Sequence, residues 1–322
     1  MPTTRFAQIE PTTRCNYTCG FCVGRSMRQA DLEWDTFECF LSSHPSLEYV
    51  ELQGEGEPLL HPKFFDMVAA CRARGIRVSL ITNGSLLGEQ AVERLVWQQV
   101  NSVHVSLESA DPDEFQGIRG GKFAKVVDGL CLLVKRRRDL GAVWPKVGLC
   151  VTVLRRTLTA IAPIIALYKD LQLDGGISVQ RLQTMLCYTE KYDQEMLAQI
   201  VPTELWRSYM QRFREILQET GVRVGEPSGY QALFADFDPH AGRCPWLERG
   251  AYLGSDGTVT GCCLMKNPSH ALGRIGQDSP DSIAVRRQML ARTLHRGEVP
   301  SPCIGCGIAN MIVRSRVEPA QQ

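Results

Sequence analysis

Three cysteines near the start of the chain are the strongest chemical signal in the sequence. Cys15, Cys19 and Cys22 have the spacing C-x3-C-x2-C and follow a short apolar run. Thiolates are soft ligands that suit iron–sulfur clusters or zinc. Three thiolates leave one iron of a four-iron cluster without a protein ligand, so that this iron is open to a substrate or cofactor. A structural zinc site usually needs a fourth protein ligand, and no further cysteine or histidine lies close by in sequence.

A second group of cysteines lies in the last quarter of the chain. It comprises Cys244, Cys262, Cys263, Cys303 and Cys306. The segment between Cys244 and Cys262 contains an Asp-Gly dipeptide, which is typical of a tight hairpin turn. A hairpin followed by the C-x2-C pair at Cys303 and Cys306 gathers four thiolates. Such a set suits an iron–sulfur cluster or zinc equally well.

The elements that must position these cysteines alternate along the first part of the chain. Six short apolar runs are predicted to be strands, at 6–10, 47–53, 77–81, 102–107, 147–154 and 177–182. Helical patterns separate them, at 35–41, 62–74, 89–99, 123–140 and 158–171. This alternation predicts βαβ units and a parallel sheet. Six repeats suit an α/β fold of the partial (βα)6 barrel type, in which ligands bind at the carboxyl ends of the strands.

We expect three parts along the chain. Residues 1–185 form the partial barrel, residues 186–240 a helical connector, and residues 241–322 a small C-terminal extension that carries the second cysteine group. The connector contains one amphipathic helix over 202–220. Four scattered cysteines lie in apolar periodic segments of the barrel, and we expect them to be small core residues. They are Cys39, Cys71, Cys131 and Cys150.

The first cysteine motif resembles the signature of a known family. C-x3-C-x2-C with the aromatic Phe21 before the last cysteine is similar to the motif of the radical S-adenosylmethionine (SAM) superfamily. The fold of that family is a partial six-strand α/β barrel. The resemblance implies a four-iron cluster on Cys15, Cys19 and Cys22 whose open iron binds the amino and carboxylate groups of SAM. It also implies that SAM is cleaved to a 5′-deoxyadenosyl radical, which removes a hydrogen atom from the substrate.

Motifs at the ends of the second and third predicted strands agree with this resemblance. Residues 53–58, QGEGEP, resemble the Gly-Gly-Glu-Pro motif of the family, with Glu55 where the first glycine usually stands. Gly56 permits a close approach of the backbone. The resemblance implies that Glu57 accepts hydrogen bonds from the SAM ammonium group. Asn83 belongs to a Thr-Asn-Gly sequence after the third strand, as in many relatives.

The fourth predicted strand and the segment after it supply three more candidate SAM contacts. Ser106 and Glu108 stand where the family contacts the ribose and amino-acid atoms of SAM. Arg119 resembles a position that meets the SAM carboxylate, which a guanidinium group can pair with through two hydrogen bonds. Each motif is weak alone, but their order at successive strand ends makes them specific together.

The C-terminal extension resembles a twitch domain, the shortened form of the SPASM domain. A full SPASM domain needs seven cysteines for two clusters, and only five are present here. The resemblance therefore implies one auxiliary four-iron cluster, with zinc as the alternative metal. Its expected ligands are Cys244, Cys262, Cys303 and Cys306. Cys263 could replace Cys262, because neighbours in a strand point to opposite faces.

Two reactions are compatible with these motifs. The leading hypothesis is a net oxidation, by dehydrogenation or crosslinking, in which the auxiliary cluster takes a second electron from the substrate radical. The alternative is a redox-neutral epimerisation, in which a cysteine thiol returns a hydrogen atom to the opposite face of the substrate. Cys187, which follows the sixth predicted strand, and Cys263 are the candidate donors. A scaffold without catalytic activity is a third hypothesis, and the intact SAM motifs argue against it.

The expected substrate is a small molecule or a peptide of natural product biosynthesis. Only fourteen residues precede Cys15, so we expect this protein to lack the N-terminal peptide-recognition domain of many peptide-modifying relatives. This favours a small molecule such as an aminoglycoside, while a peptide carried by a separate protein stays open. An electron donor such as flavodoxin or ferredoxin is an expected partner.

Charge and hydropathy exclude two classes of partner. The chain has 36 Lys and Arg residues and 35 Asp and Glu residues. It therefore lacks the basic excess of a nucleic-acid-binding protein. No apolar run approaches the roughly 18–20 residues that span a bilayer, and the N-terminus lacks the apolar core of a signal peptide. We therefore expect a cytoplasmic protein that binds neither nucleic acid nor membranes.

Overall fold

The computed structural model describes residues 3–223, 225 and 228–317. One sheet of nine strands runs through the molecule, in the order β6-β5-β4-β3-β2-β1-β7-β8-β9. The first six strands are parallel neighbours in chain order: β1 (Phe6–Ile9), β2 (Tyr49–Leu52), β3 (Arg77–Thr82), β4 (Ser102–Ser106), β5 (Lys146–Val153) and β6 (Ile177–Arg181). No ladder joins β6 to β1 in the described part of the chain, so the barrel is partial. The predicted fold class is confirmed.

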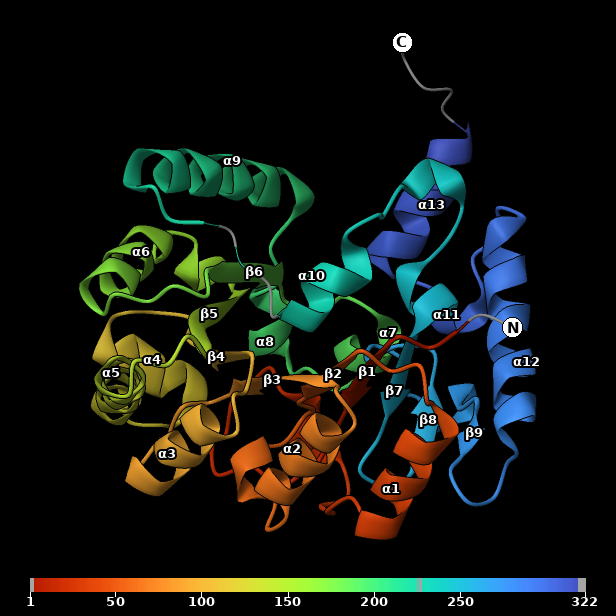
Figure 1. The fold of residues 1–322 in the computed structure, drawn as a ribbon. Coiled ribbons are helices and arrows are strands. Elements are labelled where there is room, and N and C mark those ends of the chain that lie inside the picture. Colours follow the sequence, from red (N-terminus) through yellow and green to blue (C-terminus); the bar gives the residue numbers. More distant parts are fainter. Residues whose placement is uncertain (1–2, 224, 226–227, 318–322) are drawn as a thin grey trace.

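Six helices lie around the outside of this curved sheet (Figure 1). They are α1 (Trp34–Ser43), α2 (Phe64–Ala73), α3 (Glu89–Trp97), α4 (Pro112–Arg119), α5 (Phe123–Asp139) and α6 (Ile161–Asp170). The strands turn apolar side chains such as Leu80, Val103 and Val105 toward these helices, and all three are fully buried. Alternate side chains, among them Gln8 and Ser106, face the barrel interior. The interior of the barrel is therefore polar, which suits a binding cavity.

The predicted strands and helices of the barrel agree with the structure to within a few residues, except for α4. That helix was not predicted, although its sequence carries ordinary helix signals. The side chain of Asp111 caps its first turn by accepting from the backbone N–H of Glu114 at 2.8 Å, and Pro112 follows. Gly120 ends it in a left-handed conformation, with φ 69°. The helix places Arg119, on its last turn, against the first cysteine loop.

The connector and the extension add seven helices and three strands. The helices are α7 (Leu186–Thr189), α8 (Gln194–Ala198), α9 (Thr203–Thr220), α10 (Ser228–Phe234), α11 (Pro245–Arg249), α12 (Pro280–His295) and α13 (Gly307–Val317). The strands are β7 (Gly250–Leu253), β8 (Thr258–Thr260) and β9 (Gly273–Arg274). In Figure 1, α9 lies above β6, α12 lies at the right edge of the view, and α13 lies above α11. None of the helices in the described part of the chain could cross a bilayer.

The extension continues the barrel sheet. β7 pairs in parallel with β1, so that Phe6 lies opposite Gly250 and Ile9 opposite Leu253. β7 and β8 form the predicted hairpin, and Gly257 takes the left-handed conformation that its turn requires, with φ 84°. This ladder fixes the second cysteine group relative to the barrel through backbone hydrogen bonds.

The expectation for the scattered cysteines is wrong in part. Cys71 is buried, as predicted. Cys39 and Cys131 are exposed, because they lie on the solvent-facing side of α1 and α5. Cys150 lies on the interior face of β5, where it is half-buried and lines a cavity. The spacing of apolar residues predicts which face of a helix is buried. It does not determine whether a small residue at the edge of that face is buried or exposed.

Candidate functional site

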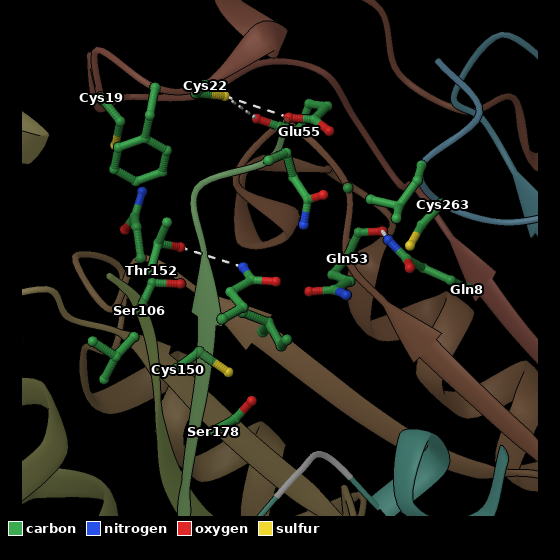
Figure 2. A pocket seen from close by; sticks show the side chains of 18 of the residues that line it. Gln8, Cys19, Cys22, Gln53, Glu55, Ser106, Cys150, Thr152, Ser178 and Cys263 are labelled. Carbon is green, nitrogen blue, oxygen red and sulfur yellow. Dashed lines mark hydrogen bonds between the residues drawn. The ribbon is translucent and has the colours of Figure 1, made fainter. Parts of the chain in front are cut away.

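A cavity of about 710 Å³ opens at the carboxyl ends of the barrel strands. Residues on or after all six strands line it, together with residues of the connector and the extension. Cys15, Cys19 and Cys22 lie on one wall, and Cys263 lies on another, across the cavity from Cys19 (Figure 2). The volume is within the usual range for a site that holds a small ligand.

The structure brings most of the predicted SAM contacts to this cavity. Phe21, Gly56, Glu57, Asn83, Ser106 and Arg119 all line it. Glu108 does not. Its carboxylate lies behind the wall, where it accepts hydrogen bonds from Arg119, one of them from Nη2 at 2.6 Å. Glu108 therefore orients Arg119 in the present arrangement.

Hydrogen-bond donors point at the sulfur atoms of the first cysteine group. The backbone N–H of Tyr17 lies 3.4 Å from Cys15 Sγ, and Asn83 Nδ2 lies 3.8 Å from the same atom. Arg119 Nη1 lies 3.8 Å from Cys19 Sγ. Burial raises the pKa of the Cys15, Cys19 and Cys22 thiols above the ordinary value. Cysteine thiolates are suitable ligands for an iron–sulfur cluster, and N–H groups point at two of the three sulfur atoms. Hydrogen bonds of this kind stabilise the thiolates of a cluster.

The Glu57 side chain joins the loops after β2 and β3. It is buried, and its Oε1 accepts from the Thr82 hydroxyl at 2.7 Å and from the backbone N–H of Leu59 at 3.2 Å. Oε2 accepts from the backbone N–H of Asn83 at 2.7 Å. Burial raises the pKa of the Glu57 carboxyl, and these donors oppose that shift. The carboxylate thus holds Asn83 in place, whether or not it also meets an ammonium group.

Gly56 lies where two loops touch. A Cβ at this position would be 2.3 Å from the carbonyl oxygen of Thr12 and 2.6 Å from that of Arg14. We expect Gly56→Ala to force these backbones apart and to lower the free energy of unfolding by about 1–3 kcal/mol. Thermal unfolding measures the effect. Gly117→Ala is the matched control: in helix α4 the added methyl group would find only an Arg156 nitrogen, at 3.9 Å, and stability should hold or rise. Equal effects of the two changes would contradict the prediction.

A buried ion pair links the barrel to the extension, and the sequence did not reveal it. Lys266 Nζ lies 3.2 Å from Glu55 Oε1 and donates to the Tyr252 hydroxyl at 2.9 Å. Burial alone lowers the pKa of Lys266, but Tyr252 and Glu55 raise it well above the ordinary value. Glu55 stands where the family motif usually has glycine. This unusual carboxylate is the one feature of the sequence that could have suggested a cationic partner.

Glu10 directly follows β1, and its side chain is buried. Its Oε1 accepts from the backbone N–H of Glu55 at 2.7 Å. Its Oε2 accepts from the Ser255 hydroxyl at 3.2 Å. Glu10 therefore ties the loop after β2 to the hairpin of the extension.

Four cysteines of the second group gather in one apolar cluster behind the cavity. Cys244, Cys262, Cys303 and Cys306 pack there with Leu247, Met265 and Ile312. Burial raises the pKa of Cys244 to about 11 and that of Cys303 to about 12. Cys244 precedes α11, whose first backbone N–H groups oppose the shift at its thiol. Four thiols beside a helix N-terminus fit a cluster that binds thiolates.

The two candidate hydrogen donors lie in different places. Cys263 lines the cavity near the Tyr230 hydroxyl and Lys266; burial raises its pKa to about 11, and both neighbours lower it. Cys187 is not among the residues that line the cavity. Its thiol lies 3.5 Å from the carbonyl oxygen of Leu264 and packs in a separate apolar cluster. The geometry thus favours Cys263 over Cys187 as a residue that could meet a substrate.

The alternative metal, zinc, would need several ligand side chains placed around a single ion. Within the described ranges, no group of three or more His, Cys, Asp or Glu side chains is placed to hold one metal ion. A zinc ion would need ligand atoms about 2.0–2.3 Å away.

Comparisons with known proteins find similarity over the barrel. Residues 9–144 match the Radical SAM superfamily. A Pyrococcus furiosus protein, the tungsten-containing aldehyde ferredoxin oxidoreductase cofactor-modifying protein, is 27% identical over 177 residues, which are 53% of this chain and 50% of that protein. The AdoMet-dependent heme synthase of Methanosarcina barkeri is 30% identical over 173 residues, 52% of this chain and 48% of that protein. The chain thus spans about half the length of these curated relatives.

A solved structure shares the fold over nearly the whole chain. Streptococcus suis SuiB bound to precursor peptide SuiA superposes with a TM-score of 0.72. The match covers 97% of this chain and 71% of that one, at 15% identity. It therefore extends the likeness of fold beyond the barrel, into the connector and the extension.

Proposed function

We propose, on the premise that residues 9–144 carry a radical SAM superfamily domain, that this protein is an enzyme that cleaves SAM and oxidises a second substrate. The substrate is a small molecule or a peptide, and the oxidation is a dehydrogenation or a crosslinking. The observation that supports this most is the cavity itself. It has Cys15, Cys19 and Cys22 on one wall, while Cys263 lines another and its neighbour Cys262 joins the second cysteine group.

The residues of the first wall have distinct tasks. Cys15, Cys19 and Cys22 would hold a four-iron cluster, and Asn83 and Arg119 would donate to its sulfur ligands. When bound, the cluster supplies the electron that cleaves SAM to methionine and a 5′-deoxyadenosyl radical, which takes a hydrogen atom from the substrate. Glu57 holds the Asn83 loop, and Glu108 orients Arg119. Phe21 and Ser106 complete the wall and exclude water.

The second cysteine group supports net oxidation. After losing a hydrogen atom, the substrate must release one more electron and a proton to become a stable two-electron-oxidised product. Cys244, Cys262, Cys303 and Cys306 would hold an auxiliary four-iron cluster that accepts this electron. The redox-neutral alternative receives less support, because one of its two candidate hydrogen donors, Cys187, is not among the residues that line the cavity.

The relatives bear on the substrate and partners only by similarity. The name of the Pyrococcus furiosus relative describes a cofactor-modifying protein, and that of the Methanosarcina barkeri relative describes a heme synthase. The SuiB structure contains a precursor peptide. A peptide is therefore as well supported as a small molecule. No disulfide joins the cysteines of the described residues, which suits the reducing cytoplasm. We also propose flavodoxin or ferredoxin as the electron donor.

Metal content and SAM cleavage test this proposal directly. The protein is purified without oxygen and reconstituted, and its iron and sulfide are counted while 5′-deoxyadenosine is assayed with SAM and dithionite. About eight irons per chain together with 5′-deoxyadenosine are expected for two four-iron clusters. About four irons with one zinc would remove the electron-accepting role of the extension. A protein with eight irons that never forms 5′-deoxyadenosine would contradict the proposal.

A further inference from the structure

A chain of hydrogen bonds at the barrel end of the cavity has a fixed direction. Gln8, on β1, is 4% exposed, and its Nε2 donates to the backbone carbonyl of Gln53 at 3.2 Å. A carbonyl oxygen can only accept, so the orientation of the Gln8 amide is determined. Its Oε1 must then face the other way, where the Tyr230 hydroxyl donates to it.

The direction of the chain determines what Gln53 presents. The single proton of the Tyr230 hydroxyl goes to Gln8, so this oxygen accepts from Gln53 Nε2, at 2.8 Å. One N–H of the Gln53 amide is engaged by the Tyr230 hydroxyl, so Oε1 points away from that hydroxyl, and no residue of 3–223, 225 and 228–317 donates to Oε1. Gln53 lines the cavity, and Figure 2 shows it beside Gln8 and Cys263. The cavity therefore contains an oriented, neutral acceptor.

The charges of the cavity decide which donors this acceptor can receive. Arg119, Arg181 and Lys266 line the cavity, against the carboxylates of Glu55 and Glu57. Glu55 is paired with Lys266, and Glu57 already accepts three hydrogen bonds. Arg119 and Lys266 are themselves paired with Glu108 and Glu55, and Arg181, which lies over the Trp206 ring, is the one of the three cations without a carboxylate partner among the described residues. Its positive charge would repel a cationic substrate.

We propose that Gln53 determines substrate specificity by accepting a hydrogen bond from a neutral N–H or O–H group, such as a carboxamide or a hydroxyl. This inference rests on the proposed function, because it assigns the substrate class of the same cavity. It disfavours the polycationic aminoglycosides that the sequence suggested. A buried acceptor of this kind rejects ligands that lack the donor, because it would be left unpaired.

The test uses three fluorinated probes of similar size on the reconstituted protein: 2-fluoroacetamide, 2-fluoroethylammonium and fluoroacetate. Line broadening in ¹⁹F NMR measures the binding of each one. We expect the amide to broaden at least threefold more than the ammonium probe. Gln53→Met should remove this preference. Tyr230→Phe should weaken it, because Gln53 then loses the hydroxyl that orients its amide. Gln211→Met, an exposed glutamine on α9 whose amide donates to Glu215, is the matched control and should change nothing.

A second variant guards against a trivial loss of folding. Gln53→Glu keeps the shape but adds a negative charge, so we expect the preference to reverse toward 2-fluoroethylammonium. A misfolded protein would show no preference rather than the opposite one. Equal broadening by all three probes in the native protein, or an unchanged pattern in Gln53→Met, would overturn the inference. A protein with the expected pattern but no 5′-deoxyadenosine would refute the proposed function and leave the acceptor assignment standing.

Discussion

Cys22→Ala will abolish 5′-deoxyadenosine formation while the protein keeps about four irons in the extension. The same result is expected for Cys15→Ala and Cys19→Ala, because a four-iron cluster with only two protein ligands cannot hold its open iron in place. Removing a residue that only orients a metal ligand already lowers metal affinity or activity by about 10–100-fold. Removing a ligand itself should lower them further. The measurement is the rate of 5′-deoxyadenosine release with SAM and dithionite, together with the iron count of each variant.

The matched controls are two other cysteines of the same chain. Cys39→Ala removes an exposed thiol of α1 and should leave both readouts at the native level. Cys303→Ala removes a thiol of the second group and should give the reverse pattern, in which SAM cleavage continues while the extension loses its metal. SAM cleavage that survives in Cys22→Ala would assign the first cysteine group to another role.

Arg119→Met will lower the free energy of unfolding by about 3–5 kcal/mol, the usual cost of removing one partner of a buried ion pair. The side chains of Arg119 and Glu108 are 7% and 1% exposed. Although burial alone lowers the pKa of Arg119, the Glu108 carboxylate raises it above the ordinary value. The variant leaves Glu108 buried and uncompensated. Urea denaturation at neutral pH, followed by circular dichroism on the metal-free protein, measures the loss.

The double variant Arg119→Met/Glu108→Leu separates the charge effect from lost packing. Because it removes the stranded carboxylate as well, it should recover most of the stability. Arg136→Met is the control, since its ion pair with Glu93 is exposed and should contribute less than about 1 kcal/mol. If the single and double variants were equally unstable, the ion pair would not be the cause.

Local patterns predicted much of this molecule. The barrel strands follow from short apolar runs, and both cysteine groups follow from spacing alone. The signals of the strands and of the first cysteine group lie within a few residues of one another, so they need no tertiary information, whereas the second group is spread from Cys244 to Cys306. Even α4, which was not predicted, carries its signals in Asp111, Pro112 and Gly120.

Contacts between distant residues could not be predicted. Gln53 meets Tyr230 across 177 positions of the chain, and Glu55, after β2, meets Lys266, which follows β8. The sequence around Tyr230 and Lys266 contains no motif that predicts these contacts. The different placement of Cys187 and Cys263 has the same origin, because only the packing of the connector against the extension decides which thiol reaches the cavity.

The pairing of β1 with β7 also bears on how the chain is made. β1 is synthesised well before β7, because Phe6 and Gly250, which lie opposite each other, are 244 positions apart in the chain. At about 5–20 residues per second, on the order of tens of seconds separate them. During that interval one edge of β1 has no strand to pair with, and an unpaired edge invites association with other chains. The pairing of β7 with β1 therefore closes this edge only late in synthesis.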